Sequence, residues 1–292
     1  MTTGVNRWAQ DAVNHVARSA VGRPVDRSLR ITVNFHPDRA TYGATVLELL
    51  RRDGAYRSQF ETGTSNGGLT AHPGGARWRW EQRIFGYVYD DAPPTVRPKY
   101  GALNHRRRRI GAAPRFGSAH LRLSEKVLDR STFCFPDSVF NPSDTATADR
   151  FDLLRLTEAF DARELTDEIE ATEGGLLDDY VEAQVHGPID LASDVEALVL
   201  DPCFRGAAVA DQAHELGVPV EWHEGRRLPV AVLEQRHPAF RGPRTVDVGR
   251  RIARDGYLDA VVLGRAAAAG AHDPQDLKRV WHCVARFGSP VE

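Results

Sequence analysis

The chain has 292 residues, 41% of them hydrophobic and 27% charged, which is ordinary for a globular protein with a sizeable core. Its formal net charge of −2 gives no global field that would favour nucleic acid or an anionic membrane. Three widely spaced cysteines argue against a disulfide framework and a cysteine zinc site. No apolar run approaches the roughly 20 residues of a membrane helix, and the N-terminus lacks a signal-peptide pattern, so we expect a cytoplasmic protein without a membrane partner.

The first part of the chain predicts a helix, a strand and a second helix. Apolar residues at near-helical spacing indicate an amphipathic helix over residues 6–20. Residues 29–35 (LRITVNF) alternate like a strand and lead directly into His36 and Arg39. Residues 45–52 predict a helix that Gly54 ends.

Residues 56–75 are rich in Gly, Ser, Thr and Asn and have neither a helical nor a strand period. A structureless loop of this length is uncommon in a compact domain and is more often functional than idle. Its TSNGG core offers hydroxyls, an amide and open backbone N–H groups, which suit a polar, phosphate-bearing ligand. The alternative is a surface loop with ordinary turn chemistry.

The run Arg106 to Arg109 follows an aromatic-rich segment at residues 77–89, which we expect to be partly helical. Four arginines form either a contact for nucleic-acid phosphates or a solvated face. Several histidines are scattered along the chain, but no H-E-x-x-H motif or regular carboxylate spacing supports a metal site, so none is predicted. These histidines are His72, His105, His120, His186 and His223.

Residues 116–123 (FGSAHLRL) and 127–135 predict two strands, and residues 149–161 predict a helix. Residues 180–188 (YVEAQVHGP) then form a short, mostly alternating strand with Glu182 in its middle. A carboxylate in a strand interior is unusual, so it either faces solvent or lines a functional cleft. In the last third we expect helices at residues 192–200, 207–216, 247–254 and 276–287, and a strand at 218–225.

The order of these motifs resembles the ADP-ribosyltransferase fold: a strand ending at His36, then FGSAHLRL and RSTFCFPDS, then a strand with a central glutamate. The phrase VEAQVHGPIDLASDVEAL is similar to the DNA-modifying toxin branch of that fold. The whole chain also looks like a member of a bacterial family with the motifs FETGTSNGGLTAHPGG and KYGALNHRRR, a likeness that brings no function with it.

The resemblance implies an α+β fold with a split, mixed and mostly antiparallel sheet and flanking helices. Residues 1–28 would form an N-terminal helix and linker, residues 29–205 the core, and residues 206–292 a C-terminal αβ extension. The implied activity is mono-ADP-ribosyl transfer from NAD to a protein or nucleic-acid acceptor, with release of nicotinamide.

The resemblance also implies roles for single residues. Glu182 would be the catalytic carboxylate, and Gln184 would position the acceptor nucleophile. His36 and Arg39 would hold the adenine-side ribose and the diphosphate. Residues that would border the nicotinamide ribose or line the cofactor or acceptor are Ser118, Ser131, Thr132, Thr62, Ser65 and Asn66.

Two positions depart from the family pattern. Pro37 follows His36 where many relatives have glycine, and proline has no backbone N–H for the nicotinamide amide, so Arg39 is an alternative first-motif residue. Tyr180 stands two positions before Glu182, where many members with protein targets have Glu or Gln, so the acceptor class stays open. A non-catalytic nucleic-acid-binding protein remains the main alternative, and a histidine-metal hydrolase is a weaker one.

Overall fold

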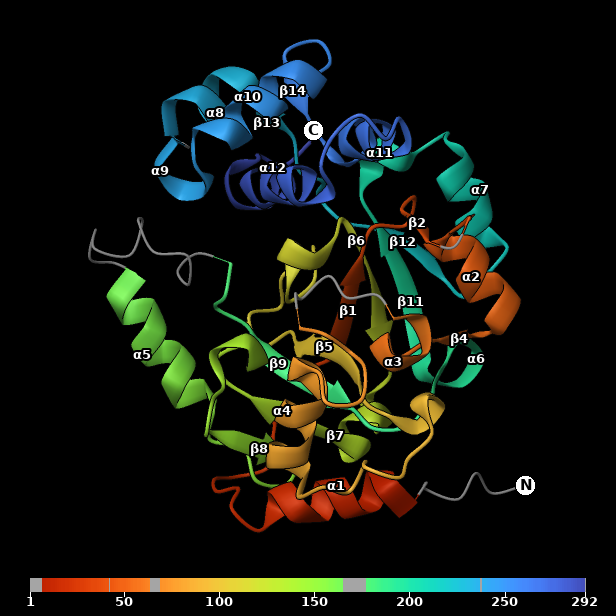
Figure 1. Ribbon diagram of the computed structural model, residues 1–292, viewed down its shortest axis with the longest axis vertical. Helices are drawn as coiled ribbons and strands as arrows, with labels where there is room; N and C mark the ends of the chain where they lie inside the picture. Colours follow the sequence, from red (N-terminus) through yellow and green to blue (C-terminus); the bar gives the residue numbers. More distant parts are fainter. Residues whose placement is uncertain (1–6, 42, 64–68, 165–176, 237, 292) are drawn as a thin grey trace.

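The computed structural model describes residues 7–41, 43–63, 69–164, 177–236 and 238–291 (Figure 1). A mixed sheet of eight strands runs through its centre, with helices around it. In spatial order these strands are β12 (Val220–Trp222), β11 (Val195–Leu200), β6 (Ala119–Leu123), β1 (Ile31–Phe35), β5 (Lys99–Leu103), β9 (Val181–Val185), β7 (Ser131–Cys134) and β8 (Thr145–Thr147). Only β11 and β12 pair in parallel among these neighbours, so the predicted α+β class with a mixed, mostly antiparallel sheet is confirmed.

The ladder is shortest between β1 and β5 near the centre of this sheet. These two strands share two residue pairs, Ile31 with Leu103 and Thr32 with Ala102. Beyond these pairs, β1 continues against β6 and β5 continues against β9. A Cβ on Gly101 would lie 2.7 Å from the carbonyl oxygen of Thr32, so only glycine fits where the strands begin to part. The sheet therefore opens toward the end of β1.

The two faces of the sheet differ in chemistry. Directly opposed residues in antiparallel strands point to the same face, so the register places Thr32, Ala102 and Glu182 together. Helix α4 (Ala76–Phe85) packs over this polar face, where Trp80 meets Tyr100 with ring centroids 6.1 Å apart. The opposite face is apolar and forms the main core with α2 (Val46–Asp53) and α7 (Ala208–His214). It includes Val33, Leu121, Phe133, Val181 and Ala183.

Local signals in the first part of the chain are confirmed. The opening helix is α1 (Arg7–Ala17). Helix α2 starts with a capping box in which the Thr45 hydroxyl accepts from the Glu48 N–H, and it ends at Gly54 in the left-handed conformation with φ 62°.

The stretch at residues 56–75 contains more structure than expected. It begins with β4 (Ala55–Tyr56) and with α3 (Gln59–Thr62), and a second capping box formed by Ser58 and Glu61 starts this helix. Residues 64–68 lie outside the described residues. The prediction of a wholly structureless loop was wrong because capping at Ser58 stabilises a short helical turn.

The segment predicted as a helix at residues 192–200 is instead mostly β11, and only α6 (Leu191–Asp194) is helical. Its VEALVL run is short and apolar, and such a run is compatible with either a buried strand or a buried helix. Pairing with both β6 and β12 favours the strand. The other α-helix and strands before residue 206 are β2 (Ala40–Thr41), β3 (Ala44–Thr45), α5 (Leu154–Glu164) and β10 (Ile189–Asp190).

The C-terminal part has its own apolar cluster above the end of β1 (Figure 1). The extension that we expected from residue 206 also adds β12 to the large sheet. Its other elements are β13 (Leu228–Pro229), α8 (Val230–Arg236), α9 (Pro238–Arg241), α10 (Pro243–Ile252), β14 (Tyr257–Leu258), α11 (Ala260–Ala268) and α12 (Pro274–Phe287). None of the helices in the described part of the chain is long and apolar enough to cross a membrane.

Candidate active site

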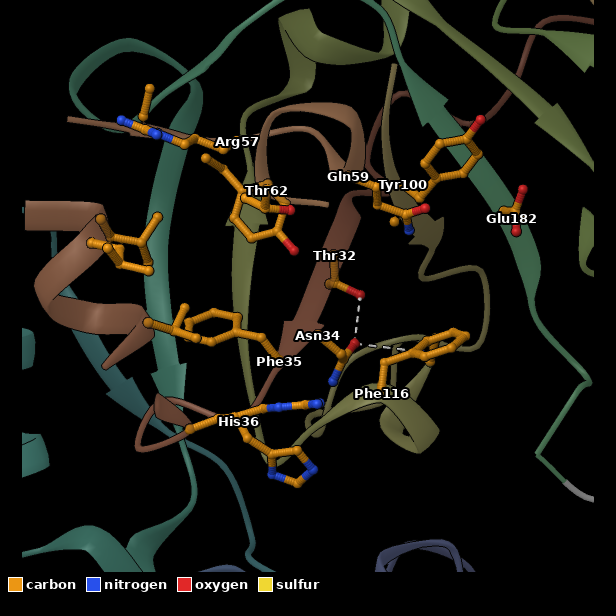
Figure 2. Close-up of a pocket in the computed structure, with 18 of the residues that line it drawn as sticks. Thr32, Asn34, Phe35, His36, Arg57, Gln59, Thr62, Tyr100, Phe116 and Glu182 are labelled. Atoms are coloured by element: carbon orange, nitrogen blue, oxygen red, sulfur yellow. Dashed lines mark hydrogen bonds between the residues drawn. The ribbon is translucent and has the colours of Figure 1, made fainter. Parts of the chain in front are cut away.

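A cavity of about 370 Å³ lies where β1 and β5 diverge (Figure 2). Thr32 and Asn34 of β1 line it, and His36 and Glu182 lie toward opposite ends of the group of side chains that the figure shows. Further lining residues come from separate segments of the chain and include Arg39, Leu50, Tyr56, Gln59, Thr62, Arg77, Tyr100, Phe116, Asp137 and Tyr180. The cavity therefore brings together residues that are far apart in sequence.

Glu182 is 4% exposed, and its carboxylate is held from several sides. The Ser138 hydroxyl donates to Oε2 at 2.8 Å, and the Gln184 amide donates to Oε1 at 3.0 Å. A guanidinium nitrogen of Arg77 lies 3.9 Å from Oε1 and donates to the Ser138 hydroxyl at 2.7 Å. Burial and the nearby Asp137 carboxylate raise the pKa of Glu182 to about 8, and Arg77 acts in the opposite direction.

Gln184 belongs to a buried hydrogen-bond chain that ends at Glu182, which we call the relay. The Tyr89 hydroxyl lies 2.8 Å from Nδ1 of His186, and Nε2 of His186 lies 2.9 Å from the Thr132 hydroxyl. Thr132 donates to Oε1 of Gln184 at 2.9 Å, so its oxygen accepts from Nε2–H of His186. Every bond in the relay then points toward Glu182, and this direction fixes the orientation of the Gln184 amide.

Asp137 supplies a second carboxylate at the cavity wall. It accepts hydrogen bonds from the Tyr180 hydroxyl and, at 2.8 Å, from the backbone N–H of Val139. The Ser138 hydroxyl also lies 3.2 Å from Oδ1 of Asp137, so one serine connects both carboxylates. Two buried carboxylates with different partners are typical of sites that control protonation.

Arg77 is the buried cation of this site. It is 3% exposed, and its guanidinium carbon lies 3.8 Å from the centre of the Tyr100 ring. Its Nε has no hydrogen-bond partner among the described residues. The same holds for Oε1 of Gln59, which also lines the cavity. Unpartnered buried polar atoms are uncommon in folded proteins and mark places where a ligand or water completes the bonding.

At the other end of the cavity, the His36 ring contacts Trp281 of α12 edge-on, with ring centroids 4.8 Å apart. The Ser118 hydroxyl lies 3.4 Å from Nδ1 of His36. Burial and the Arg39 charge lower the pKa of His36 to about 3, so the ring is neutral at physiological pH. The C-terminal extension therefore contributes directly to the surroundings of His36.

The structure groups part of the residue set that the sequence predicted. His36, Arg39, Thr62 and Glu182 line one cavity. Ser65 and Asn66 lie outside the described residues.

Four other predicted residues are not among those that line the cavity in the described part of the chain: Ser118, Ser131, Thr132 and Gln184. Ser118 contacts His36, and Thr132 holds Gln184. We expected Gln184 to position an acceptor nucleophile, but its amide is buried and bonded within the protein, so it positions Glu182 instead.

Sequence reasoning missed Arg77, Asp137, Ser138 and Tyr100 as members of the site. Asp137 and Ser138 stand in the RSTFCFPDS motif directly after a strand, a position from which polar side chains often reach a site. Arg77 and Tyr100 gave no comparable signal, because each lies in a segment with aromatic or Pro-rich composition.

The basic run is largely neutralised within the protein. Arg106 and Arg108 pair with Asp179, and Arg107 pairs with Asp26 at 3.0 Å. Arg107, Arg108 and Arg109 also line a second cavity of about 290 Å³. This cavity is basic, but Arg107 and Arg108 are each paired with a carboxylate. Trp80, Phe85 and Tyr89 of the preceding aromatic segment are buried in a core cluster.

In the described part of the chain, no three His, Cys, Asp or Glu side chains are grouped as metal ligands.

A family model described as a protein of unknown function, DUF3626, matches residues 30–166 and 153–287. The chain belongs to the DUF3626 family. A search of curated proteins finds no match to it. In this DUF3626 protein, the first matched stretch contains His36 and the second contains both Glu182 and α12.

Proposed function

We propose that this DUF3626 protein is an NAD-dependent mono-ADP-ribosyltransferase with Glu182 as its catalytic carboxylate. The observation that carries the proposal is the shared cavity: Glu182 from β9 and His36 and Arg39 from the end of β1 face one opening in the sheet. The resemblance in sequence assigns these three residues to NAD. The short junction between β1 and β5 supports a split-sheet fold of the transferase kind.

The residue types suit the chemistry. When the bond between C1′ of the ribose and nicotinamide breaks, its electron pair leaves with nicotinamide, and positive charge develops on the ribose. The Glu182 carboxylate, hydrogen-bonded to the ribose 2′-hydroxyl, would stabilise that charge where it appears. An acceptor nucleophile then forms the new bond to C1′ and gives up its proton.

The surroundings of Glu182 fit this role. The relay and Ser138 hold the carboxylate in one orientation before substrate arrives, which is the preorganisation that electrostatic stabilisation requires. The cationic nicotinamide ring would stabilise the ionised form of Glu182 and lower its raised pKa. In the free protein, the Glu182 carboxyl is therefore neutral or partly ionised. Binding of the substrate would shift it to the ionised form that the reaction needs.

The geometry gives less support to a nucleic-acid-binding protein built on the basic run. Three of those arginines are paired with carboxylates. The aromatic side chains that would stack on bases, such as Trp80 and Phe85, lie in the core. The acceptor of the proposed transfer stays open between protein and nucleic acid.

The test is nicotinamide release from NAD by purified wild-type protein and by Glu182→Gln. The variant keeps the shape of the side chain and removes its charge, so we expect release to fall by about 10²–10³-fold, as for the loss of one preorganised electrostatic group. Glu221→Gln, an exposed strand position with an ion pair to Arg122, is the matched control and should release nicotinamide at the wild-type rate. Equal rates in wild type and Glu182→Gln, or no release by wild type with any acceptor, would end the proposal.

A further inference from the structure

His282 of α12 is a buried histidine whose ring nitrogens lack partners in the described part of the chain. Its side chain is 4% exposed, and neither ring nitrogen has a hydrogen-bond partner among the described residues. A neutral imidazole offers one donor and one acceptor, and buried polar atoms of this kind are nearly always paired. The missing partner indicates a group that binds here and that the chain itself does not supply.

Helix α12 lies next to the end of β1 (Figure 1), and its Trp281 contacts His36, which lines the cavity. The Trp281 indole N–H donates to the carbonyl oxygen of Pro114 at 2.8 Å, and the Trp281 ring meets His36. Pro114 begins the 3₁₀ turn that carries Arg115 and Phe116, and Phe116 lines the cavity. The helix face that holds His282 is therefore a neighbour of the cavity.

Basic side chains gather around His282. Lys278 precedes it by one helical turn on α12, and Arg241 ends α9, which packs against α12. Burial, and then the charges of Arg115, Arg241 and Lys278, lower the pKa of His282 well below its usual value.

The pKa of Lys278 is lowered in the same way, by burial and then by the charges of Arg115, Arg39 and Arg241. Carboxylates of the described residues offset part of this charge, since Asp178 pairs with Arg115 and Asp137 acts on Lys278. Like charges held this close repel one another, so a bound anion would stabilise the arrangement.

We propose that Arg39, Arg115, Arg241, Lys278 and His282 form a binding site for the diphosphate group of the ligand whose other end occupies the cavity. Arginine forks suit phosphate oxygens, and a lysine and an imidazole N–H add single donors. Arg39 belongs both to this cluster and to the cavity lining, so one ligand reaches from the cluster to Glu182. That this ligand is NAD rests on the proposed function; the anion site itself does not.

The first experiment is a calorimetric titration of the wild-type protein with inorganic pyrophosphate at low salt. We expect saturable binding that ADP-ribose competes away, because both would place a diphosphate in the same cluster. Lys278→Gln and His282→Gln should each weaken pyrophosphate binding by about tenfold, the loss expected for one charge-assisted hydrogen bond. Arg279→Gln is the matched control, since Arg279 is exposed, pairs with Asp276 and should leave binding unchanged.

The same variants are measured for nicotinamide release. Loss of a contact to a part of the substrate that does not react should raise KM for NAD by about tenfold and leave kcat nearly unchanged. If the wild type binds no pyrophosphate, or if both variants bind it as tightly as Arg279→Gln, the site is wrong even when nicotinamide release is normal. If pyrophosphate binds as expected but NAD is not turned over, the anion site stands and the proposed transferase fails. Binding of pyrophosphate without competition by ADP-ribose would overturn the link between the cluster and the cavity.

Discussion

The two faces of the central sheet are about equally buried and chemically opposite. On one face, Val33, Leu121 and Phe133 are each at most 1% exposed and pack into the main core. On the other, Thr32 and Thr132 are also 1% exposed, and they share that face with Glu182. Burying polar groups gains little stability even when they are hydrogen-bonded, whereas burying apolar groups drives folding. The apolar face therefore accounts for the stability of the sheet. The buried polar side chains of the other face are better explained by a function than by stability.

The largest change in stability should come from the apolar face. Leu121→Ala removes a fully buried side chain from the centre of the core and should lower the free energy of unfolding by about 2–5 kcal/mol. Chemical denaturation measures this loss. Because Leu121 is not among the residues that line the cavity, nicotinamide release per folded molecule should stay within about twofold of wild type. A large loss of turnover in a variant shown to be folded would mean that the two faces are not separable.

The polar face should show the opposite sign at Glu182. Its pKa is raised in the folded protein from an ordinary 4.5 to about 8, so the stability linked to its proton is full below about pH 4.5 and is lost as pH rises through 8. Glu182→Gln has no such proton to lose. We therefore expect it to unfold at a higher temperature than wild type at pH 8, with an advantage of about 4 kcal/mol that shrinks toward pH 5. A variant that is less stable than wild type at pH 8 would contradict this assignment.

The smallest effect is expected within the relay. Thr132→Val keeps the shape of the side chain but breaks the hydrogen bonds from His186 and to Gln184, which should cost about 1 kcal/mol of stability. Because the amide of Gln184 then loses its fixed orientation, the pH midpoint of nicotinamide release should also move, whereas a merely structural role would leave it in place. Thr147→Val, the same change at the residue opposite Thr132 on β8, lies outside the relay and is the control. An unchanged pH midpoint in Thr132→Val would show that the relay does not act on Glu182.

Much of the fold could be read from local patterns in the sequence. The helix that ends at Gly54 and the strand that carries Glu182 follow from capping and alternation, which depend on neighbouring residues. The segment at residues 192–200 could not be assigned in this way, because partners on two sides decide between helix and strand there. Strand β5 was not expected at all, since it is hidden in a Pro-rich passage and contains Gly101.

The residues of the candidate site also fall into two groups: those that local sequence patterns signal and those that only tertiary packing brings into place. His36, Arg39 and Glu182 stand at the ends or centres of recognisable strands, and they line one cavity. Arg77 and His282 reach their places only through the packing of α4 and α12, so no spacing in the sequence signals them. The role that we gave Gln184 failed for a related reason: the hydrogen bond to Thr132 depends on a pairing between β7 and β9 that sequence order does not reveal.

The order of the strands also sets the time at which the site can first exist during synthesis. Strand β9 lies between β5 and β7, although both of those strands are made before it. A nascent chain must hold β5 and β7 apart, or pair them wrongly and later separate them, until residue Val185 has left the ribosome. Trp281 closes the surroundings of His36 still later, almost at the end of the chain. The surroundings of the proposed site are therefore complete only after α12 has been synthesised.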